Sequence, residues 1–237
     1  MKAKLFAISV LLLTLIGCAS PQPLVALNND IIRNTDNRIG VAMNAFPEAG
    51  LRLPGADCLL CLAVAFGVNS ELNTHAKTLP TDDLDDLKSA VGDVLESQGK
   101  NVVVIEDDLD IDNLAKTKSL GEGFSKKDFS EFADKYHIDH MIVIDIDFIG
   151  LTRPYSSYIP TGQPQALVSG RVSMVNLETN KFNWYLPIAS YLSADGEWDE
   201  PTEFPNLTNA YYQVIENIRD MLLAPLDEAD VNPHWGE

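Results

Sequence analysis

The pattern that most constrains the fold is an alternation of large apolar and charged residues near the middle of the chain. Between Met141 and Ile149, one face of the segment carries Asp145 and Asp147. The opposite face carries four large apolar residues, Ile142, Ile144, Ile146 and Phe148. A period of two residues predicts a strand with one face packed on a core.

Other strands and helices surround this strand and define a single domain. Strands are also predicted at 39–43, 102–105, 167–177 and 182–186, and helices at 81–98, 125–136 and 208–223. The order β-α-β-α-β-β-β-α favours parallel pairing at its start and an antiparallel hairpin around the turn at 178–180. We therefore expect one α/β (α+β) domain over 38–224, a mixed β-sheet with helices packed on it. An acidic C-terminal tail is expected over 225–237.

The first seventeen residues have the features of an export signal. Lys2 and Lys4 precede an apolar run over 5–16, which is shorter than the roughly 20 residues that a bilayer-spanning helix needs. The motif Leu15-Ile16-Gly17-Cys18 then resembles the lipobox of bacterial lipoproteins. In that family the cysteine receives a diacylglycerol, the peptide is cut before it, and the new amine is acylated. The resemblance implies a signal peptide over 1–17 and a lipid on Cys18.

The same resemblance implies a location. Ala19, not aspartate, follows the cysteine, and in Gram-negative bacteria this pattern is similar to that of lipoproteins sorted to the outer membrane. The acylated Cys18 would hold the chain on the lipid bilayer of the outer membrane, with the domain facing the periplasm. Residues 18–37 are rich in Pro, Asn and Asp without a sustained period, which predicts a flexible tether.

The charge balance excludes one class of function. The chain has 35 acidic and 17 basic residues and a net charge of −18. A non-specific nucleic-acid binder needs basic surface to displace counterions, so no nucleic-acid partner is expected. The acidic excess also opposes electrostatic docking on anionic lipid headgroups. Cleavage before Cys18 would remove Lys2 and Lys4 and leave a net charge of −20.

The most unusual segment sets Cys58-Leu59-Leu60-Cys61 inside an apolar run. Because Cys18 is assigned to the lipid, Cys58 and Cys61 remain as a pair, and an oxidising periplasm favours a disulfide between them. A structural disulfide that pins the loop to the next element is the favoured interpretation. Buried free thiols, a redox pair and a metal site are the alternatives, although zinc needs two further ligands that the nearby sequence lacks. The apolar run itself predicts a core helix or strand, with a patch facing a partner or a membrane as the alternative.

Three polar clusters are candidate sites of chemistry. The acidic run at 106–112 fails the calcium-loop pattern, since Asn113 and Ser119 occupy the positions that need glycine and glutamate. His137 and His140 straddle a predicted helix end and strand start, which separates their rings. Asp145 and Asp147 fit either an acid–base pair or, with Arg171 on a neighbouring strand, a salt-bridged sheet face, and the second is favoured. We expect no metal and no cofactor.

Two loops rich in aromatic residues and proline are candidate protein-binding surfaces. Residues 153–164 carry Tyr155 and Tyr158, and residues 196–201 carry Trp198. Rigid prolines and tyrosines suit a binding surface because little conformational entropy is lost when they are immobilised. A loop that merely packs on the domain is an equal alternative.

The predicted element order resembles a small α/β domain of several periplasmic lipoproteins of secretion and export systems. Examples are the curli-secretion lipoprotein and the amino-terminal domain of the Tol system's propeller protein. The resemblance implies a non-enzymatic accessory or scaffold protein in envelope assembly or export, with an envelope protein as partner, and it allows a homo-oligomer.

No catalytic residue is assigned, because the sequence lacks the motifs of serine hydrolases, zinc peptidases and nucleotide-binding enzymes. Two alternatives to the scaffold remain. The first is a periplasmic module that binds a small ligand or a cation, and the second is a hydrolase with an unrecognised carboxylate site.

Overall fold

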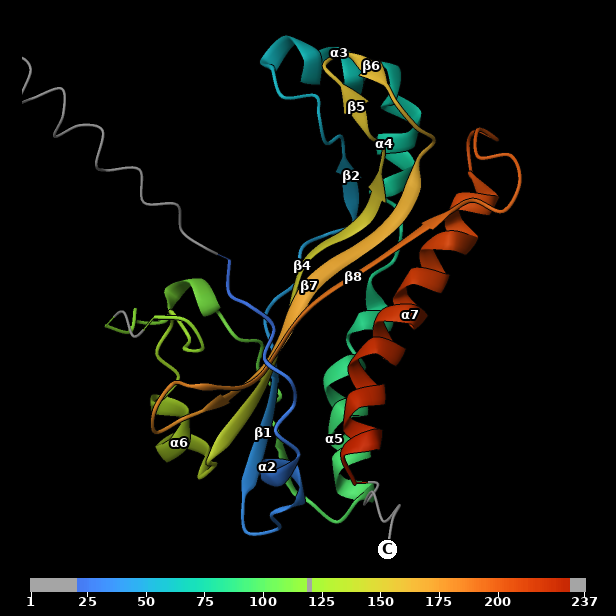
Figure 1. Cartoon of the computed structure of the whole chain (residues 1–237). Helices are drawn as coiled ribbons and strands as arrows, with labels where there is room; N and C mark the ends of the chain where they lie inside the picture. The colour runs from blue at the N-terminus through green and yellow to red at the C-terminus, as the bar shows by residue number, and fades with distance from the viewer. Residues whose placement is uncertain (1–20, 119–120, 231–237) are drawn as a thin grey trace, which may run out of the picture.

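The computed structural model describes residues 21–118 and 121–230, and Figure 1 shows their arrangement. A six-stranded sheet runs through the domain in the order β3-β1-β4-β7-β8, and β2 pairs with β4 beyond the end of β1. The strands are β1 (Arg38–Met43), β2 (Gly50–Arg52), β3 (Asn101–Val104), β4 (His140–Thr152), β7 (Gln165–Asn176) and β8 (Phe182–Ser193). The predicted single α+β domain with a mixed sheet is confirmed.

The direction of the strands follows the order of the elements. Strand β1 pairs in parallel with both β3 and β4, and the crossover from β1 to β3 includes helix α5 (Leu87–Ser97). Strands β4, β7 and β8 are successively antiparallel, as expected for strands joined by hairpins. Helix α6 (Glu131–Tyr136) precedes β4, and helix α7 (Pro205–Asp230) follows β8.

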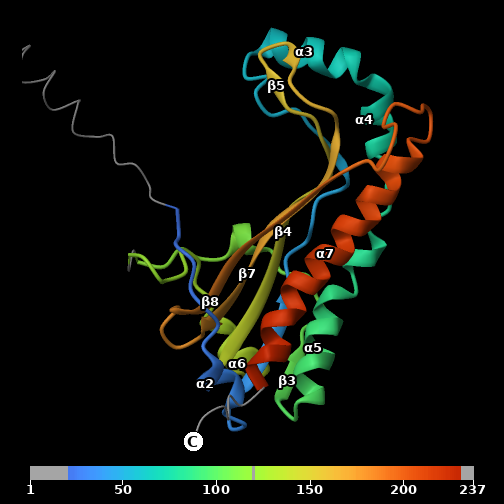
Figure 2. The ribbon, with the colours of Figure 1, turned by 45° about the vertical axis from the view of Figure 1, so that its right-hand side comes forward.

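Several elements are inserted into the predicted order. Helices α3 (Leu59–Val68) and α4 (Ser70–Ala76) follow β2, and the short hairpin of β5 (Tyr155–Ser156) and β6 (Ile159–Pro160) interrupts the connection from β4 to β7. Figures 1 and 2 both place α3 and this hairpin side by side at one end of the elongated molecule. A turn of 3-10 helix at Asp82–Leu84 occupies the predicted start of α5.

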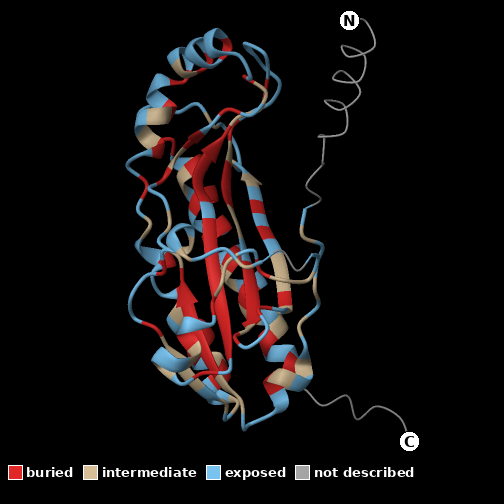
Figure 3. Cartoon of the chain, turned by 90° about the vertical axis from the view of Figure 1, so that its left-hand side faces the viewer, coloured by how far each residue is buried: buried red, intermediate tan, exposed pale blue. Residues whose placement is uncertain are grey.

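The two faces of the sheet are covered differently. Helices α5 and α7 pack on one face, where Ile142, Ile144 and Ile146 of β4 join the main core. On the other face, Met141 and Val143 join a smaller core under α6. Burial on both faces explains why β4 is apolar along most of its length. Figure 3 shows the strands of the sheet as the buried centre of the domain.

Helix α7 is longer than the sequence indicated. It continues through Pro225 to Asp230, although proline in a helix removes one backbone hydrogen bond and crowds the preceding turn. Leu226 and Ala229 are fully buried, and this packing holds the helix together beyond the proline. The prediction of a tail that starts at residue 225 is therefore corrected for 225–230, and 231–237 lie outside the described residues.

The chain before β1 is packed on the domain. Val25 forms a two-way backbone bridge with Tyr185 of β8, with N···O distances of 3.0 and 2.9 Å. Helix α2 (Asn29–Arg33) then buries Ile32 completely. The predicted flexible tether over 18–37 is thus corrected for residues 21–37, because an open strand edge and an apolar side chain fix this segment. The predicted signal peptide and Cys18 lie outside the described residues.

Within the two described ranges, every helix is too short or too polar to cross a lipid bilayer.

Candidate functional site

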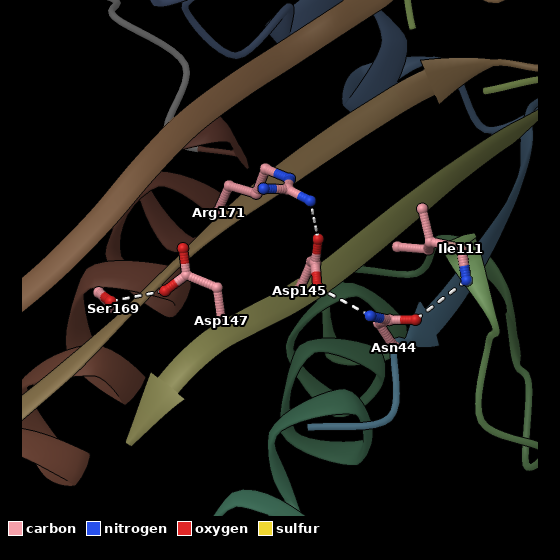
Figure 4. A network of polar contacts seen from close by, with 6 residues as sticks. All are labelled: Asn44, Ile111, Asp145, Asp147, Ser169 and Arg171. Carbon is pink, nitrogen blue, oxygen red and sulfur yellow. Dashed lines mark hydrogen bonds and ion pairs between the residues drawn. The ribbon is translucent and has the colours of Figure 1, made fainter. Parts of the chain in front are cut away.

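The polar part of the sheet is built around an ion pair between two neighbouring strands. Asp145 and Arg171 are direct cross-strand partners of β4 and β7, and the Arg171 guanidinium donates to the Asp145 carboxylate. The other Asp145 oxygen accepts from Asn44 Nδ2 at 2.9 Å, and Asn44 Oδ1 accepts from the Ile111 N–H at 3.1 Å (Figure 4). The salt-bridged sheet face that the sequence favoured is present.

The two carboxylates of β4 have separate partners. Asp147 lies at a bulge in the β4–β7 register and accepts from Ser169 Oγ at 2.6 Å. Asp145 is buried, and both its oxygens are engaged by Arg171 and Asn44, whereas Asp147 is exposed. A general acid–base pair needs carboxyl groups free to reach a substrate, so this arrangement suits a structural network better than acid–base catalysis.

A cavity of about 410 Å³ opens beside this ion pair. Its floor includes Asp145, Arg171 and Ser173, and its apolar walls are formed by Ile111, Phe124, Phe129, Val143, Phe182 and Tyr185. Pro21 and Gln22 close one side, and the Gly123 N–H donates to the Gln22 side chain at 3.1 Å. The volume is within the usual range for small-molecule sites, and the floor offers both a donor and an acceptor.

A second feature is an exposed apolar surface at the end of the molecule, which we call the apolar tip. It consists of α3 and the β5–β6 hairpin. Its exposed side chains include Leu59 (90%), Leu60 (75%), Val68 (66%), Tyr158 (62%) and Ile159 (58%), and Leu62 and Val64 of α3 are exposed to a smaller extent. The prediction that the Cys58–Val68 run is a core element is therefore corrected. It forms a helix, but only Cys61 and Ala65 are buried in it.

The apolar tip is held rigidly on the domain by a buried polar network. Asn69, which is 3% exposed, donates to the Tyr155 hydroxyl and to the Ala65 carbonyl. Arg153 donates to Asn69 Oδ1 at 2.8 Å and lies 4.8 Å from the centre of the Trp198 ring. These contacts join the hairpin to the junction of α3 and α4.

The three aromatic residues proposed as partner-binding differ in exposure. Tyr158 is exposed at the turn of the hairpin, as a binding residue must be. Tyr155 is 6% exposed and Trp198 is half-buried, so both belong to the internal network of the tip rather than to its surface. Aromatic character alone did not distinguish the anchoring tyrosine from the exposed one.

Cys58 and Cys61 are joined by a disulfide at the start of α3. Cys58 is exposed and is the residue that caps the helix, and its Sγ accepts from the Cys61 N–H at 2.9 Å. Cys61 lies in the first turn of the same helix. The disulfide therefore joins the end of the loop before α3 to the first turn of this helix, which is the role that the sequence suggested for it, and it reaches no distant element.

The histidines and the acidic run have structural roles. His140 is 4% exposed, and its Nδ1 lies 3.1 Å from Asn183 Nδ2. Burial lowers the pKa of His140, and the carboxylate of Asp139 opposes this shift only in part. His137 ends α6 in the left-handed conformation. Asp110 accepts from both nitrogens of Asn113 and so closes a local turn. Among the described residues, no three acidic, histidine or cysteine side chains form a metal site.

No protein-family model and no curated protein matches the sequence. The solved structures to which this chain is similar at low identity include the following three. A PelC dodecamer from Paraburkholderia phytofirmans is 10% identical, with 87% of this chain and 94% of that chain covered and a TM-score of 0.33. A DUF330 protein from Xanthomonas campestris is 11% identical over 89% of this chain and 98% of that one, with a TM-score of 0.35. The lipoprotein GNA1162 from Neisseria meningitidis is 12% identical over 76% and 99%, with a TM-score of 0.28.

Proposed function

We propose that this chain is a non-enzymatic accessory protein of the bacterial envelope, anchored in the outer membrane through an acylated Cys18. In this proposal the domain faces the periplasm and binds an envelope protein through the apolar tip. The observation that supports it most is the apolar tip itself, because soluble domains rarely expose a contiguous surface of large aliphatic and aromatic side chains without a binding role.

The chemistry of the apolar tip defines the partner that it fits. Helix α3 and the hairpin from Tyr155 to Gln163 contain no charged residue, in a chain with a net charge of −18. A partner gains nothing from charge complementarity here and must offer a complementary apolar surface. Burial of aliphatic side chains contributes about 25 cal/mol for each Å² of apolar surface removed from water.

A protein partner suits this surface better than the membrane does. Binding to an anionic leaflet is strengthened by Lys and Arg beside the apolar residues. The nearest charged residues along the chain on either side of α3 are Asp57 and Glu71, both of which are acidic and exposed. The rigid network under the tip also preorganises it, which lowers the entropy lost when a specific partner binds.

The anchor and the domain are close together in the chain. Pro21, which lines the cavity beside Asp145 and Arg171, is only three residues beyond Cys18. Three extended residues span about 10 Å, so an acylated Cys18 would hold the domain against the membrane surface. Partners embedded in or bound to that membrane would then meet the domain at a high effective concentration.

Site-specific photo-crosslinking in intact cells tests the proposal. A photoreactive residue at position 60 or 158 is expected to give one crosslinked envelope protein, whereas the same residue at exposed Glu216 on α7 gives none. Leu60→Ser should abolish the crosslink from position 158 while the melting temperature is unchanged. Binding of the purified domain to zwitterionic vesicles, without any protein crosslink, would contradict the proposal in favour of a membrane contact.

The cavity beside Asp145 and Arg171 supports a second candidate function, a module that binds a small amphipathic ligand. Its apolar walls and charged floor would suit a molecule with an apolar body and one polar group. A metabolite screen by thermal shift tests this function, with Arg171→Ala as the variant that should lose the shift. A ligand-induced shift that persists in Arg171→Ala would place the ligand elsewhere.

A further inference from the structure

We propose that Cys58–Cys61 is a redox-active disulfide, which accepts two electrons from a pair of thiols on the protein bound at the apolar tip. The inference rests on the proposed function for its partner, and it adds a chemical reaction to what that function describes as binding alone. Four observations on the described residues support it, and each concerns a different property of the disulfide.

The first observation is the unequal exposure of the two sulfur-bearing residues. Cys58 is exposed at the N-terminus of α3, whereas Cys61 is 8% exposed and belongs to the main core. An incoming thiol can therefore approach the Cys58 side of the disulfide, while the Cys61 side is shielded by the domain. Thiol–disulfide exchange depends on which sulfur can be reached, so this arrangement gives the reaction a direction.

The second observation is that the disulfide contributes little to the fold. Its two residues are three apart, at the N-cap and in the first turn of one helix, so no distant segments are connected. The stabilisation that a disulfide provides by restricting the unfolded chain falls as the closed loop becomes shorter. The junction of α3 and α4 is instead attached to the hairpin by Asn69, Tyr155 and Arg153. The attachment of the apolar tip to the domain therefore rests mainly on these contacts rather than on the disulfide.

The third observation is the helix that carries the two cysteines. The N–H groups at the start of an α-helix and its dipole stabilise a negative charge, and thiolates at such positions have a lowered pKa. The Cys58 sulfur already accepts from the Cys61 N–H at 2.9 Å in the disulfide form. The helix is therefore placed to stabilise the Cys58 thiolate that leaves when the mixed disulfide with the partner is resolved.

The fourth observation is the surface around the disulfide. Leu59 and Leu60 lie between the two cysteines and are the most exposed large apolar residues of α3. Tyr158 and Ile159 of the neighbouring hairpin extend this surface. A partner segment that binds these four side chains is held beside Cys58, so binding and exchange would occur at one place.

The reaction balances without any further reagent. A thiolate of the partner attacks Cys58 Sγ, a bond forms between these two sulfurs, and the Cys58–Cys61 bond breaks with its electron pair on Cys61, which takes up a proton. A second partner thiolate then attacks the partner sulfur of the mixed disulfide. The Cys58 thiolate leaves and is protonated, and the partner carries the new disulfide. A disulfide of a second protein restores Cys58–Cys61 by the same steps in reverse.

Equilibration of the mature protein in glutathione buffers tests the inference. Thiols are trapped by alkylation and counted by mass spectrometry. We expect the reduced fraction of the pair to rise from about one tenth to about nine tenths as the ratio [GSH]²/[GSSG] increases about a hundredfold. A pair that stays oxidised over the whole range that glutathione reaches, and is reduced only by dithiothreitol, would overturn the inference.

Two single variants test the direction of attack. With oxidised glutathione as the probe, Cys58 in Cys61→Ala should form a mixed disulfide at least about ten times faster than Cys61 in Cys58→Ala. Equal rates would contradict the assigned order of attack. The melting temperatures of both variants show whether each is folded. If one variant is unfolded, the glutathione equilibrium of the unaltered protein still tests whether the disulfide is redox-active.

A double variant separates this inference from the proposed function. In Cys58→Ser/Cys61→Ser, the crosslink from position 158 should persist, because the apolar tip is unchanged. Persistence of the crosslink together with an unreactive natural disulfide would reject the redox inference and leave the binding function intact. If the protein with its natural cysteines gives no crosslink from position 158 in cells, although its disulfide reacts with glutathione, the binding function is rejected instead.

Discussion

Asp145 and Arg171 face each other across β4 and β7, and their ion pair lies on the sheet face turned away from α5 and α7. The Asp145 side chain is buried, whereas that of Arg171 is 44% exposed. The pair therefore has one buried member, whose carboxylate is compensated by the Arg171 guanidinium.

Removal of the exposed member should leave the buried charge undercompensated. We expect Arg171→Ala to lower the free energy of unfolding by about 1–3 kcal/mol, because Asp145 would retain only its bond from Asn44. Urea unfolding measures this change. Asp147→Asn, which changes an exposed carboxylate on the same strand, is the matched control and should stay within about 0.5 kcal/mol. Equal losses in the two variants would contradict the role given to the pair.

The buried His140 and the half-buried His75 make stability dependent on pH. Burial lowers the pKa values of His75 and His140 in the folded protein, although Glu203 and Asp139 oppose the shifts. The unfolded chain then binds more protons than the folded one below about pH 6.5. The free energy of unfolding should therefore fall as the pH is lowered through this value, with a slope of at most about 1.4 kcal/mol per pH unit for each histidine.

His140→Gln supplies the control for the pH dependence. Glutamine is polar but does not titrate, so the slope between about pH 7 and 5 should become smaller. An unchanged slope would mean that His140 contributes nothing to it. Thermal or urea unfolding over this pH range provides the measurement.

The chain before β1 should contribute to stability. Ile32 is fully buried against the core, so Ile32→Ala is expected to cost about 2–5 kcal/mol. Leu24→Ala, at a side chain that is 69% exposed, should change the free energy of unfolding by less than about 0.5 kcal/mol. If residues 21–37 were a loose tether, both variants would change the free energy of unfolding only slightly. The comparison therefore distinguishes a packed segment from a flexible tether.

Gly150 is required where β2 joins β4. Its φ angle is 138°, and a Cβ atom there would lie 2.1 Å from the Gly50 carbonyl oxygen. Gly150→Ala should therefore separate β2 from β4 and cost at least about 2 kcal/mol. Gly67 in α3 has nothing within 4 Å of such an atom, and Gly67→Ala should stabilise the protein by about 0.5–1 kcal/mol. Circular dichroism melting of both variants compares them.

The sequence allowed the sheet and its polar face to be predicted. The sequence places Asp145 and Arg171 on neighbouring strands, and the register that makes them face each other is seen only in the structure. Helix α7 was also evident from its apolar stripe, except for its last turn beyond Pro225. Local patterns sufficed for these elements because each is long and packs along its whole length.

The apolar tip could not be predicted in the same way. An apolar run without polar residues has no periodicity to show which face is exposed, so α3 was interpreted as core. The hairpin from Tyr155 was one loop among several, and only its contact with Asn69 explains why Tyr155 is buried and Tyr158 is not. Such contacts join segments that are far apart in the chain, and no local pattern records them.

The bridge between Val25 and Tyr185 has a mechanical consequence. If Cys18 is anchored, a force on the lipid first meets the hydrogen bond from the Gly123 N–H to Gln22 and then this bridge, which has two hydrogen bonds to the outer strand of the sheet. The force would then be transmitted to β8 and, through its hydrogen bonds, to the neighbouring β7. A flexible tether would instead extend under the force. The same bridge covers part of the β8 edge, so detachment of residues 21–28 would expose a strand that another molecule could extend into an aggregate.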